Sequence, residues 1–255
     1  MALIGWRGRG GGKPRIVPLG DSAMLAEFAT TVDMAVNARI QQVAALVRER
    51  APAWVRDVVP SMAAIAVHFD VAAVAARNLK GADAGIAAAR EELRRLLELC
   101  ALDVPKATEE ETEAIEVPVC YGGEHGEDLE AVAAQLKMSP AEVVRRHCES
   151  PHRVLMVGFA PGHPYIGGLD PALSIPRRAT PRVRVPEGSI AIANGQSVVY
   201  PFTISGGWSI LGRTPLRVFD AAATPPAIFF PGQRVRFVAI DAAEYARLRA
   251  KAGRR

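Results

Sequence analysis

Apolar runs of two different periods organise the first 122 residues. Runs on either side of Gly20-Asp21 predict a strand or hairpin over Arg15–Phe28. Apolar residues spaced by three and four predict a helix that Asp33 caps and that ends near Arg50. The same patterns predict strands at Val55–Val59, Ala64–Phe69 and Ile115–Tyr121, and one more helix from Asp83 onward. This order of strand, helix, strand, strand, helix, strand is typical of a ferredoxin-like domain, which we expect over residues 15–122.

Two short helices are predicted next, at about Asp128–Lys137 and Pro140–His147. The second begins with a capping box, because Ser139 stands at the N-cap and Glu142 three residues later. We expect a helical connector over residues 123–152. The charged segment Asp103–Glu113 lacks any period and is interpreted as a surface loop.

From residue 153 onward the pattern changes to short apolar strands separated by Gly and Pro turns. Seven strands are predicted, at Val154–Phe159, Arg182–Val185, Ser189–Ala193, Val198–Pro201, Ser209–Arg213, Ala227–Phe229 and Arg234–Ala239. So many short strands favour a closed β-barrel over residues 153–255, with a C-terminal helix at Ala242–Ala252. The predicted fold class is therefore α+β.

Composition narrows the class of protein. The net charge of +4 is carried largely by the two ends, which disfavours a nucleic-acid-binding surface. The three cysteines, Cys100, Cys120 and Cys148, form no CxxC pair, which fits reduced thiols in the cytoplasm. Residues 1–14 are interpreted as a disordered tail: they resemble neither a signal peptide nor a phosphate loop, since no Ser or Thr follows Lys13. No apolar run approaches the roughly 18 residues of a membrane span.

The candidate chemistry lies between Val157 and Asp220, where Gly, Pro, Arg and single aromatics are interleaved. The arginines of PRRATPRVR have two interpretations: a clamp on a carboxylate or phosphate, or the charged protection of an edge strand. They are Arg177, Arg178, Arg182 and Arg184. Arg213 stands alone where a strand ends and is the better anion contact.

Other polar side chains keep two interpretations each. His163 is either an acid, base or ligand contact, or an ordinary turn histidine. Ser197 is a candidate donor to a carbonyl or phosphoryl oxygen, and Tyr200 and Trp208 form either a pocket wall or part of the core. His147, Cys148 and His152 are interpreted as a solvated connector rather than metal ligands, and no metal site is predicted. No carboxylate pair is placed for acid–base work, so we expect another subunit to complete the site.

Three segments, FAPGHPYIGGLD, PRRATPRVRVPEGSIAIANGQ and GGWSILGRTP, resemble the signature of the 5-oxoprolinase B-subunit family. That family is also called allophanate hydrolase subunit 1, carboxyltransferase subdomain C/D or the KipI-type inhibitors. The N-terminal half agrees at LGDSAMLAEF and VVPSMAAIAVHFD. The resemblance spans about Pro18 to Ile240 and implies a ferredoxin-like domain followed by a cyclophilin-like barrel.

The resemblance also implies a function. Family members work with two further chains, the homologous C subunit plus the A subunit, to open 5-oxoproline to glutamate at the expense of ATP, whose Mg²⁺ accompanies the nucleotide. We therefore predict Gln196, Arg213 and Tyr200 as catalytic residues. The predicted substrate- or phosphate-binding residues are Arg182, Ser197, Trp208, His163 and Arg178.

Two alternatives remain open within the family. One is a KipI-like inhibitor of a sensor histidine kinase, and the other is a carboxyltransferase subunit related to urea carboxylase or allophanate hydrolase. The chain departs from the usual family pattern at His163, where an aromatic is usual, and at Ser197 and Val198, where Thr and Gly are usual. These positions surround the predicted pocket, so the departures bear on the identity of the substrate.

Overall fold

The computed structural model describes residues 14–31, 33–77, 81–103 and 113–252. The chain divides into two compact units, residues 1–110 and 111–255, which are described separately. Residues 1–13 of the predicted N-terminal tail, and most of the predicted loop Asp103–Glu113, lie outside the described residues. Within the part of the chain that is described, no helix is both long and apolar enough to cross a membrane.

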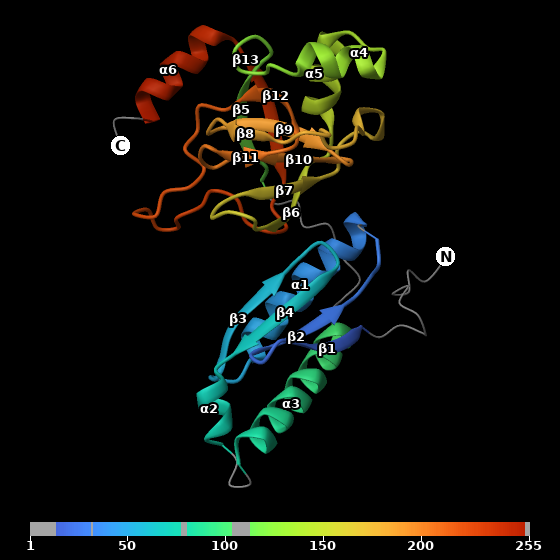
Figure 1. Cartoon of the computed structure of the whole chain (residues 1–255), viewed down its shortest axis with the longest axis vertical. Helices are drawn as coiled ribbons and strands as arrows, with labels where there is room; N and C mark the ends of the chain where they lie inside the picture. Colours follow the sequence, from blue (N-terminus) through green and yellow to red (C-terminus); the bar gives the residue numbers. More distant parts are fainter. Residues whose placement is uncertain (1–13, 32, 78–80, 104–112, 253–255) are drawn as a thin grey trace. The chain divides into compact units, whose positions relative to one another are not determined.

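The first unit contains a four-stranded antiparallel sheet in the order β1-β2-β4-β3 (Figure 1). The predicted hairpin is confirmed, and its turn contains Gly20 at φ +60°, a conformation that favours glycine. The strands are β1 (Arg15–Leu19), β2 (Ala23–Glu27), β3 (Val55–Pro60) and β4 (Ala64–Phe69).

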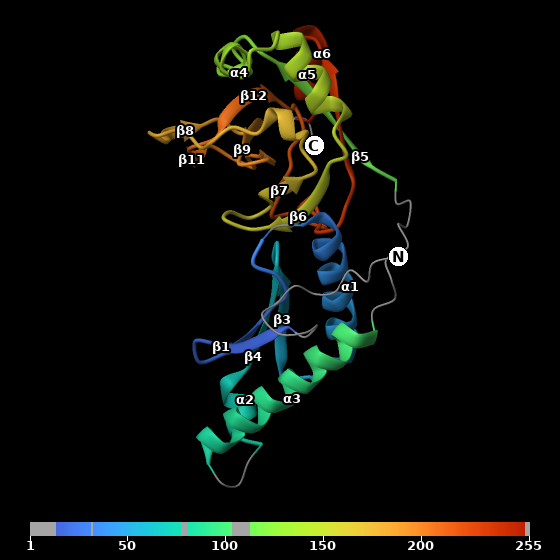
Figure 2. The same cartoon turned by 90° about the vertical axis from the view of Figure 1, so that its right-hand side faces the viewer.

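Three helices complete this unit: α1 (Met34–Arg50), α2 (Val71–Ala75) and α3 (Ala82–Asp103). The Asp33 carboxylate accepts a hydrogen bond from the Val36 amide at 2.9 Å, which confirms the predicted cap of α1. Both long helices pack into one apolar core with the sheet, and Figure 2 shows α1 alongside the strands. The short helix α2, capped by Asp70, was not predicted.

The strand Ile115–Tyr121, β5, forms as predicted but joins the second unit. It pairs in parallel with β13 (Val235–Ile240) and antiparallel with β12 (Ser209–Arg213), and its Val117 and Val119 are fully buried there. In the first sheet the edge beside β2 is taken by β1 instead. The ferredoxin-like strand order expected over residues 15–122 is therefore not confirmed. Strand β1 of the local hairpin occupies the sheet edge that the prediction gave to Ile115–Tyr121.

The second unit is a curled seven-stranded sheet in the order β13-β5-β12-β9-β10-β7-β6, beside a two-stranded ribbon of β8 and β11. The two edges of the sheet meet at one end, where the Val154 amide donates to Gln233 and the Val235 amide to His152. The sheet is thus curled and partly closed. Its remaining strands are β6 (Arg153–Val157), β7 (Pro164–Gly167), β9 (Ser189–Ala193) and β10 (Gln196–Val199).

The ribbon strands are β8 (Arg182–Val185) and β11 (Ile204–Gly206), which Figure 2 shows side by side at one edge of this unit. Two strands, β7 and β11, were not predicted. The predicted strand Ala227–Phe229 is wrong, since this segment makes only one isolated bridge, between Ala227 and Phe219.

The predicted connector helices form as α4 (Leu129–Leu136) and α5 (Pro140–Glu149). The Ser139 hydroxyl accepts from the Glu142 amide at 3.2 Å, which confirms the cap of α5. Both helices share an apolar core with Leu173 of the 3₁₀ turn η1 (Pro171–Leu173) and with β9, so they belong to the second unit. The C-terminal helix α6 spans Ala242–Ala252, as predicted.

Candidate functional site

The register of the strands sorts the predicted site residues onto two faces of the curled sheet. Cross-strand partners share a face, and Gln196 pairs with Ala193 while Arg213 pairs with Ser189. Alternation along β9 and β10 places Tyr200 on this same face. We call it the Tyr200 face, and it comprises Tyr165, Ser189, Gln196, Tyr200, Trp208 and Arg213.

Four rings cluster on the Tyr200 face. The His163 ring lies edge-on to Tyr200, with centroids 5.3 Å apart, and 5.1 Å from Tyr165. Tyr165 in turn lies 6.1 Å from Trp208. Burial raises the pKa of Tyr200 to about 12 and lowers the pKa of His163 to about 4. Both side chains are therefore neutral near pH 7, so they offer hydrogen bonds and aromatic surface rather than charge.

Three buried polar atoms in this region have no hydrogen-bond partner among the described residues. They are His163 Nδ1, Ser189 Oγ and Arg213 Nε. An unpaired buried polar group costs about 1–3 kcal/mol, so each of these atoms requires a partner, which ordered water or a bound molecule can supply. Ser189 and Arg213 are cross-strand partners, so two of the three atoms come from neighbouring positions of one face. This favours the Tyr200 face as a binding site.

Arg178 and Arg182 have a partner within the chain. Arg182 donates to both oxygens of Asp128, at 2.8 and 2.7 Å, and Arg178 donates to one of them at 3.0 Å. The Ile210 amide adds a bond of 2.7 Å to the same carboxylate, whose side chain is only 8% exposed. The role of these two arginines as phosphate ligands stays a prediction. Asp128 itself was missed, because in the sequence it reads only as the first residue of a helix.

Ser197 lies on the opposite face from Gln196 and Tyr200. Its Oγ is 3.1 Å from His147 Nε2, and His147 Nδ1 is 2.8 Å from the Tyr121 hydroxyl. That hydroxyl lies 3.5 Å from Cys148 Sγ. The structure thus places Ser197 in a buried polar chain inside the sheet rather than beside the other predicted residues.

The interpretation of His147 and His152 as a solvated connector is wrong, because both side chains are buried. Burial lowers the pKa of His147 well below its usual value and that of His152 to about 4. The His152 ring bonds to the His147 carbonyl oxygen at 2.8 Å. The signal that could have revealed this burial is the spacing of Val143 and His147, which puts both on the inner face of α5.

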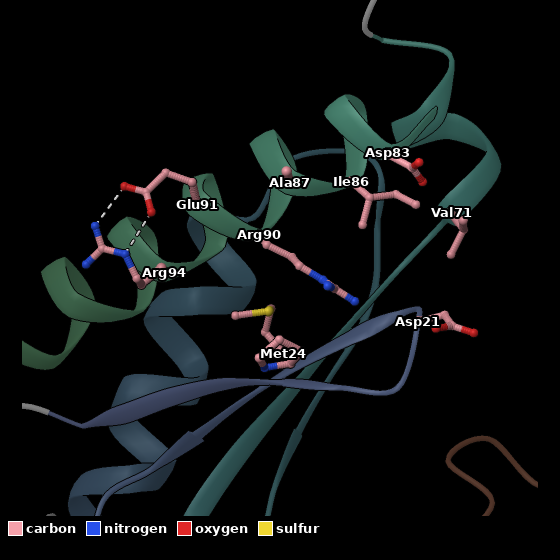
Figure 3. Close-up of a pocket in the computed structure, with 10 residues that line it drawn as sticks. Asp21, Met24, Val71, Asp83, Ile86, Ala87, Arg90, Glu91 and Arg94 are labelled. Carbon is pink, nitrogen blue, oxygen red and sulfur yellow. Dashed lines mark hydrogen bonds and ion pairs between the residues drawn. The ribbon is translucent and has the colours of Figure 1, made fainter. Parts of the chain in front are cut away.

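Two cavities lie elsewhere. One of about 760 Å³ in the first unit is lined by α3 and the β1–β2 hairpin, and Figure 3 shows Arg90 extending toward that hairpin while Arg94 pairs with Glu91. A second, of about 570 Å³, lies between α5 and β13 and includes Cys148 and Phe237. Neither includes a residue of the Tyr200 face. We place the candidate site on the Tyr200 face because two cross-strand partners there, Ser189 and Arg213, each carry a buried polar atom without a partner among the described residues. No group of three or more His, Cys, Asp or Glu in the described ranges is arranged to hold a metal.

Comparison with known proteins connects this chain to a family. The model of the carboxyltransferase domain, subdomain C and D, matches residues 14–229. The B subunit of 5-oxoprolinase from Bacillus subtilis is 36% identical over 231 residues, which are 91% of this chain and 95% of that protein. The resemblance seen in the sequence motifs is thereby confirmed.

Solved structures agree on the fold. The structure of TTHA0988 in space group P212121 matches 86% of this chain at a TM-score of 0.71 and 32% identity. The chain spans only 40% of the length of that protein. The urea amidolyase of K. lactis matches 94% of the chain at a TM-score of 0.69 but with 16% identity, over 16% of its own length. At that identity the likeness shows the fold alone.

Proposed function

Because the chain belongs to the carboxyltransferase subdomain C and D family, we propose that it is the B subunit of an ATP-dependent 5-oxoprolinase. The observation that carries this proposal is the similarity to the B subunit of the Bacillus subtilis 5-oxoprolinase, which extends over nearly the full length of both chains. The Bacillus subtilis relative is named as a subunit, which supports the presence of partner chains. We propose that these partners are the homologous C subunit and the A subunit.

The chemistry requires donors around one amide. A lactam is stabilised by resonance, and transfer of a phosphoryl group from ATP to its oxygen makes attack by water feasible. Such a step is catalysed by positioned donors and cations around the transferring group. Arg213 supplies a cation whose Nε has no partner in the described chain, and Gln196 supplies an amide from the same face. The neutral Tyr200 hydroxyl adds a donor that keeps its proton at pH 7.

ATP enters this reaction as a substrate. Arginine binds phosphoryl oxygens well, because its guanidinium is always charged and presents several N–H groups in one plane. The Mg²⁺ would travel with the nucleotide phosphates, as in other phosphoryl-transfer enzymes. The Tyr200 face as defined here carries an arginine and no carboxylate, so we assign the phosphate contacts to this chain and leave the metal on the nucleotide.

The test is a tagged pull-down from the native host, with the eluate assayed for 5-oxoproline-dependent ADP release and glutamate formation. We expect a partner similar to the C subunit, together with both products. A partner without turnover would contradict 5-oxoproline as the substrate. A histidine kinase in place of that partner would contradict the enzyme and support the KipI-like inhibitor.

Arg213→Ala is expected to abolish turnover by the purified complex while the protein stays folded. The matched control is Arg184→Ala, which removes an exposed arginine from β8. Steady-state ADP release, with circular dichroism for folding, measures the effect. Full activity of a folded Arg213→Ala protein would remove this residue from the site.

A further inference from the structure

The cavity of the first unit, between α3 and the β1–β2 hairpin, contains a cation with free donors. The Arg90 side chain extends from α3, and its Nη2 donates to the Gly20 carbonyl oxygen of the hairpin at 3.0 Å. The other N–H groups of Arg90, the buried Nε among them, have no hydrogen-bond partner in the described ranges. No described carboxylate forms an ion pair with this guanidinium. Arg90 therefore brings an unbalanced positive charge to the cavity.

The other arginine of this cavity is already neutralised. Arg94 bonds to both oxygens of Glu91, at 2.8 and 2.7 Å, and to Glu98 at 2.6 Å. Figure 3 shows the Arg94–Glu91 pair, and the Arg90 guanidinium points away from it. The pair brings no unmet charge to a ligand. Arg90 is thus the cation of this cavity that a ligand can bind.

Two carboxylates that line the cavity are also unpaired. Asp21 lies in the turn of the β1–β2 hairpin and Asp83 in the first turn of α3, and both residues are exposed. Neither carboxylate makes an ion pair or hydrogen bond with a residue in the described part of the chain. Figure 3 shows the Arg90 guanidinium directed toward the space between them. Opposite charges thus border one cavity without neutralising each other.

The geometry of α3 and the hairpin explains why these charges converge. Asp83, Ile86 and Arg90 recur at intervals of three and four residues, so they lie on one face of the helix. Asp83 and Arg90 are about 10.5 Å apart along the helix axis. Helical side chains lean toward the N-terminus, so the long Arg90 side chain spans part of that distance. On the facing hairpin, Asp21 follows Gly20, whose carbonyl oxygen Arg90 contacts. The two carboxylates therefore border the guanidinium from opposite walls of the cavity.

The rest of the cavity wall suits an apolar group. Met24 of β2, Val71 of α2 and Ile86 of α3 contribute apolar side chains, which Figure 3 draws. The cavity volume of about 760 Å³ lies within the range of about 300–1,000 Å³ that small-molecule sites occupy. Such sites combine an apolar lining with a few polar groups that fix the orientation of the ligand. This cavity offers one cation, two carboxylates and an apolar surface to a single small molecule.

We propose that this cavity binds a free α-amino acid with an apolar side chain. Its carboxylate accepts hydrogen bonds from the free N–H groups of Arg90, because a planar guanidinium matches a carboxylate. Its ammonium group donates to Asp21 and Asp83, and its side chain packs against the apolar lining. A simple anion would meet two like charges here, and a simple cation would meet Arg90, so a zwitterion fits best. The assignment is independent of the proposed 5-oxoprolinase activity, since no residue of the Tyr200 face takes part.

Isothermal calorimetry tests the proposal by titrating the full-length chain with L-leucine and with two analogues that each lack one charge. N-acetyl-L-leucine keeps the carboxylate but has no ammonium group, and isoamylamine keeps the ammonium group but has no carboxylate. We expect L-leucine to bind and each analogue to bind at least about tenfold more weakly, because each leaves part of the charge in the cavity without a partner.

Variants assign the two ends of the ligand. Arg90→Ala should weaken L-leucine binding at least about tenfold without weakening isoamylamine binding, because the amine has no carboxylate to lose. Asp83→Asn should weaken both ligands by about threefold to fivefold, a smaller change because Asp83 is exposed and Asp21 remains. The control Arg184→Ala removes an exposed arginine from β8 of the second unit and should leave the affinity for L-leucine unchanged.

Thermal unfolding of each protein without ligand verifies that it is folded. If Arg90→Ala does not fold, Asp83→Asn still tests the site, since the Asp83 side chain has no described partner to lose. A wild-type chain that does not bind L-leucine would overturn the proposal, as would equal binding by the wild type and a folded Arg90→Ala protein.

The analogues provide two further ways to overturn it. Isoamylamine bound as tightly as L-leucine would assign the cavity to plain cations, and N-acetyl-L-leucine bound as tightly would assign it to anions. Binding of L-leucine that depends on Arg90 and Asp83 as expected would support the site whether or not the chain is part of a 5-oxoprolinase.

Discussion

At the scale of single residues, Asp128 holds two of the predicted site residues, Arg178 and Arg182, although no motif had singled it out. Its buried carboxylate accepts from Arg178, from Arg182 and from the Ile210 amide. Hydrogen bonds to a charged group are worth about 1.5–3 kcal/mol each when removal leaves the partner unsatisfied. Asp128 thereby holds Arg178 and Arg182 from the N-cap of α4, a position 50 and 54 residues earlier in the chain.

Asp128→Asn is expected to lower the free energy of unfolding by about 2 kcal/mol, since it removes the buried charge that faces two cations. Urea denaturation at pH 7 measures the change. The control is Glu127→Gln, because the Glu127 side chain is 54% exposed and pairs with Arg182 alone. We expect that control to cost less than about 0.5 kcal/mol, as exposed ion pairs do. Equal losses in the two variants would refute the special position of Asp128.

At the scale of elements, the sequence predicted best what is decided locally. The caps at Asp33 and Ser139 and the alternating strand at Ser189–Ala193 all formed where expected. The strand Ile115–Tyr121 formed too, but its partners lie about 90 and 120 residues further along the chain, and no local pattern specifies such pairing. The face on which Ser197 lies could not be predicted either, because it depends on the register between β10, β9 and β7.

The ribbon strand β11 yields a prediction with a control one residue away. Gly206→Ala should destabilise the protein, because its new Cβ would lie 2.2 Å from the Tyr200 hydroxyl and 2.7 Å from the ring carbon that bears it. Overpacking of this kind costs about 1–3 kcal/mol. Gly207→Ala meets its first neighbour only at 3.6 Å, an ordinary contact. Thermal unfolding of the two variants side by side measures the difference, and a Gly206→Ala protein as stable as Gly207→Ala would show that β11 moves freely away from Tyr200.

At the scale of the whole molecule, buried histidines give the second unit a dependence on pH. His147, His152 and His163 are the buried histidines among the described residues, and all three belong to this unit. Burial lowers the pKa of His152 and of His163 to about 4, from an ordinary value of 6.5, and it lowers the pKa of His147 well below that ordinary value. The unfolded chain therefore binds more protons than the folded one below pH 6.5, so stability is complete above that pH and declines as pH falls toward 4.

Lowering the pH from 7 to 5 should accordingly reduce the free energy of unfolding of the second unit by about 1–2 kcal/mol for each buried histidine. His152→Gln should remove the part of this pH-dependent loss that His152 contributes. Glutamine stays neutral at both pH values and can still donate to the His147 carbonyl. The carboxylate effects belong to another window, since the salt-bridged Glu91 and Glu142 have pKa values lowered to about 2 and lose their contribution only below about pH 4.5. Urea denaturation at pH 5 and 7 compares the wild type, His152→Gln and a His68→Gln control from the first unit. If His152→Gln and the wild type lose the same stability between these pH values, then His152 takes up no proton on unfolding at pH 5. It would then already be protonated in the folded protein, and its burial would not keep it neutral.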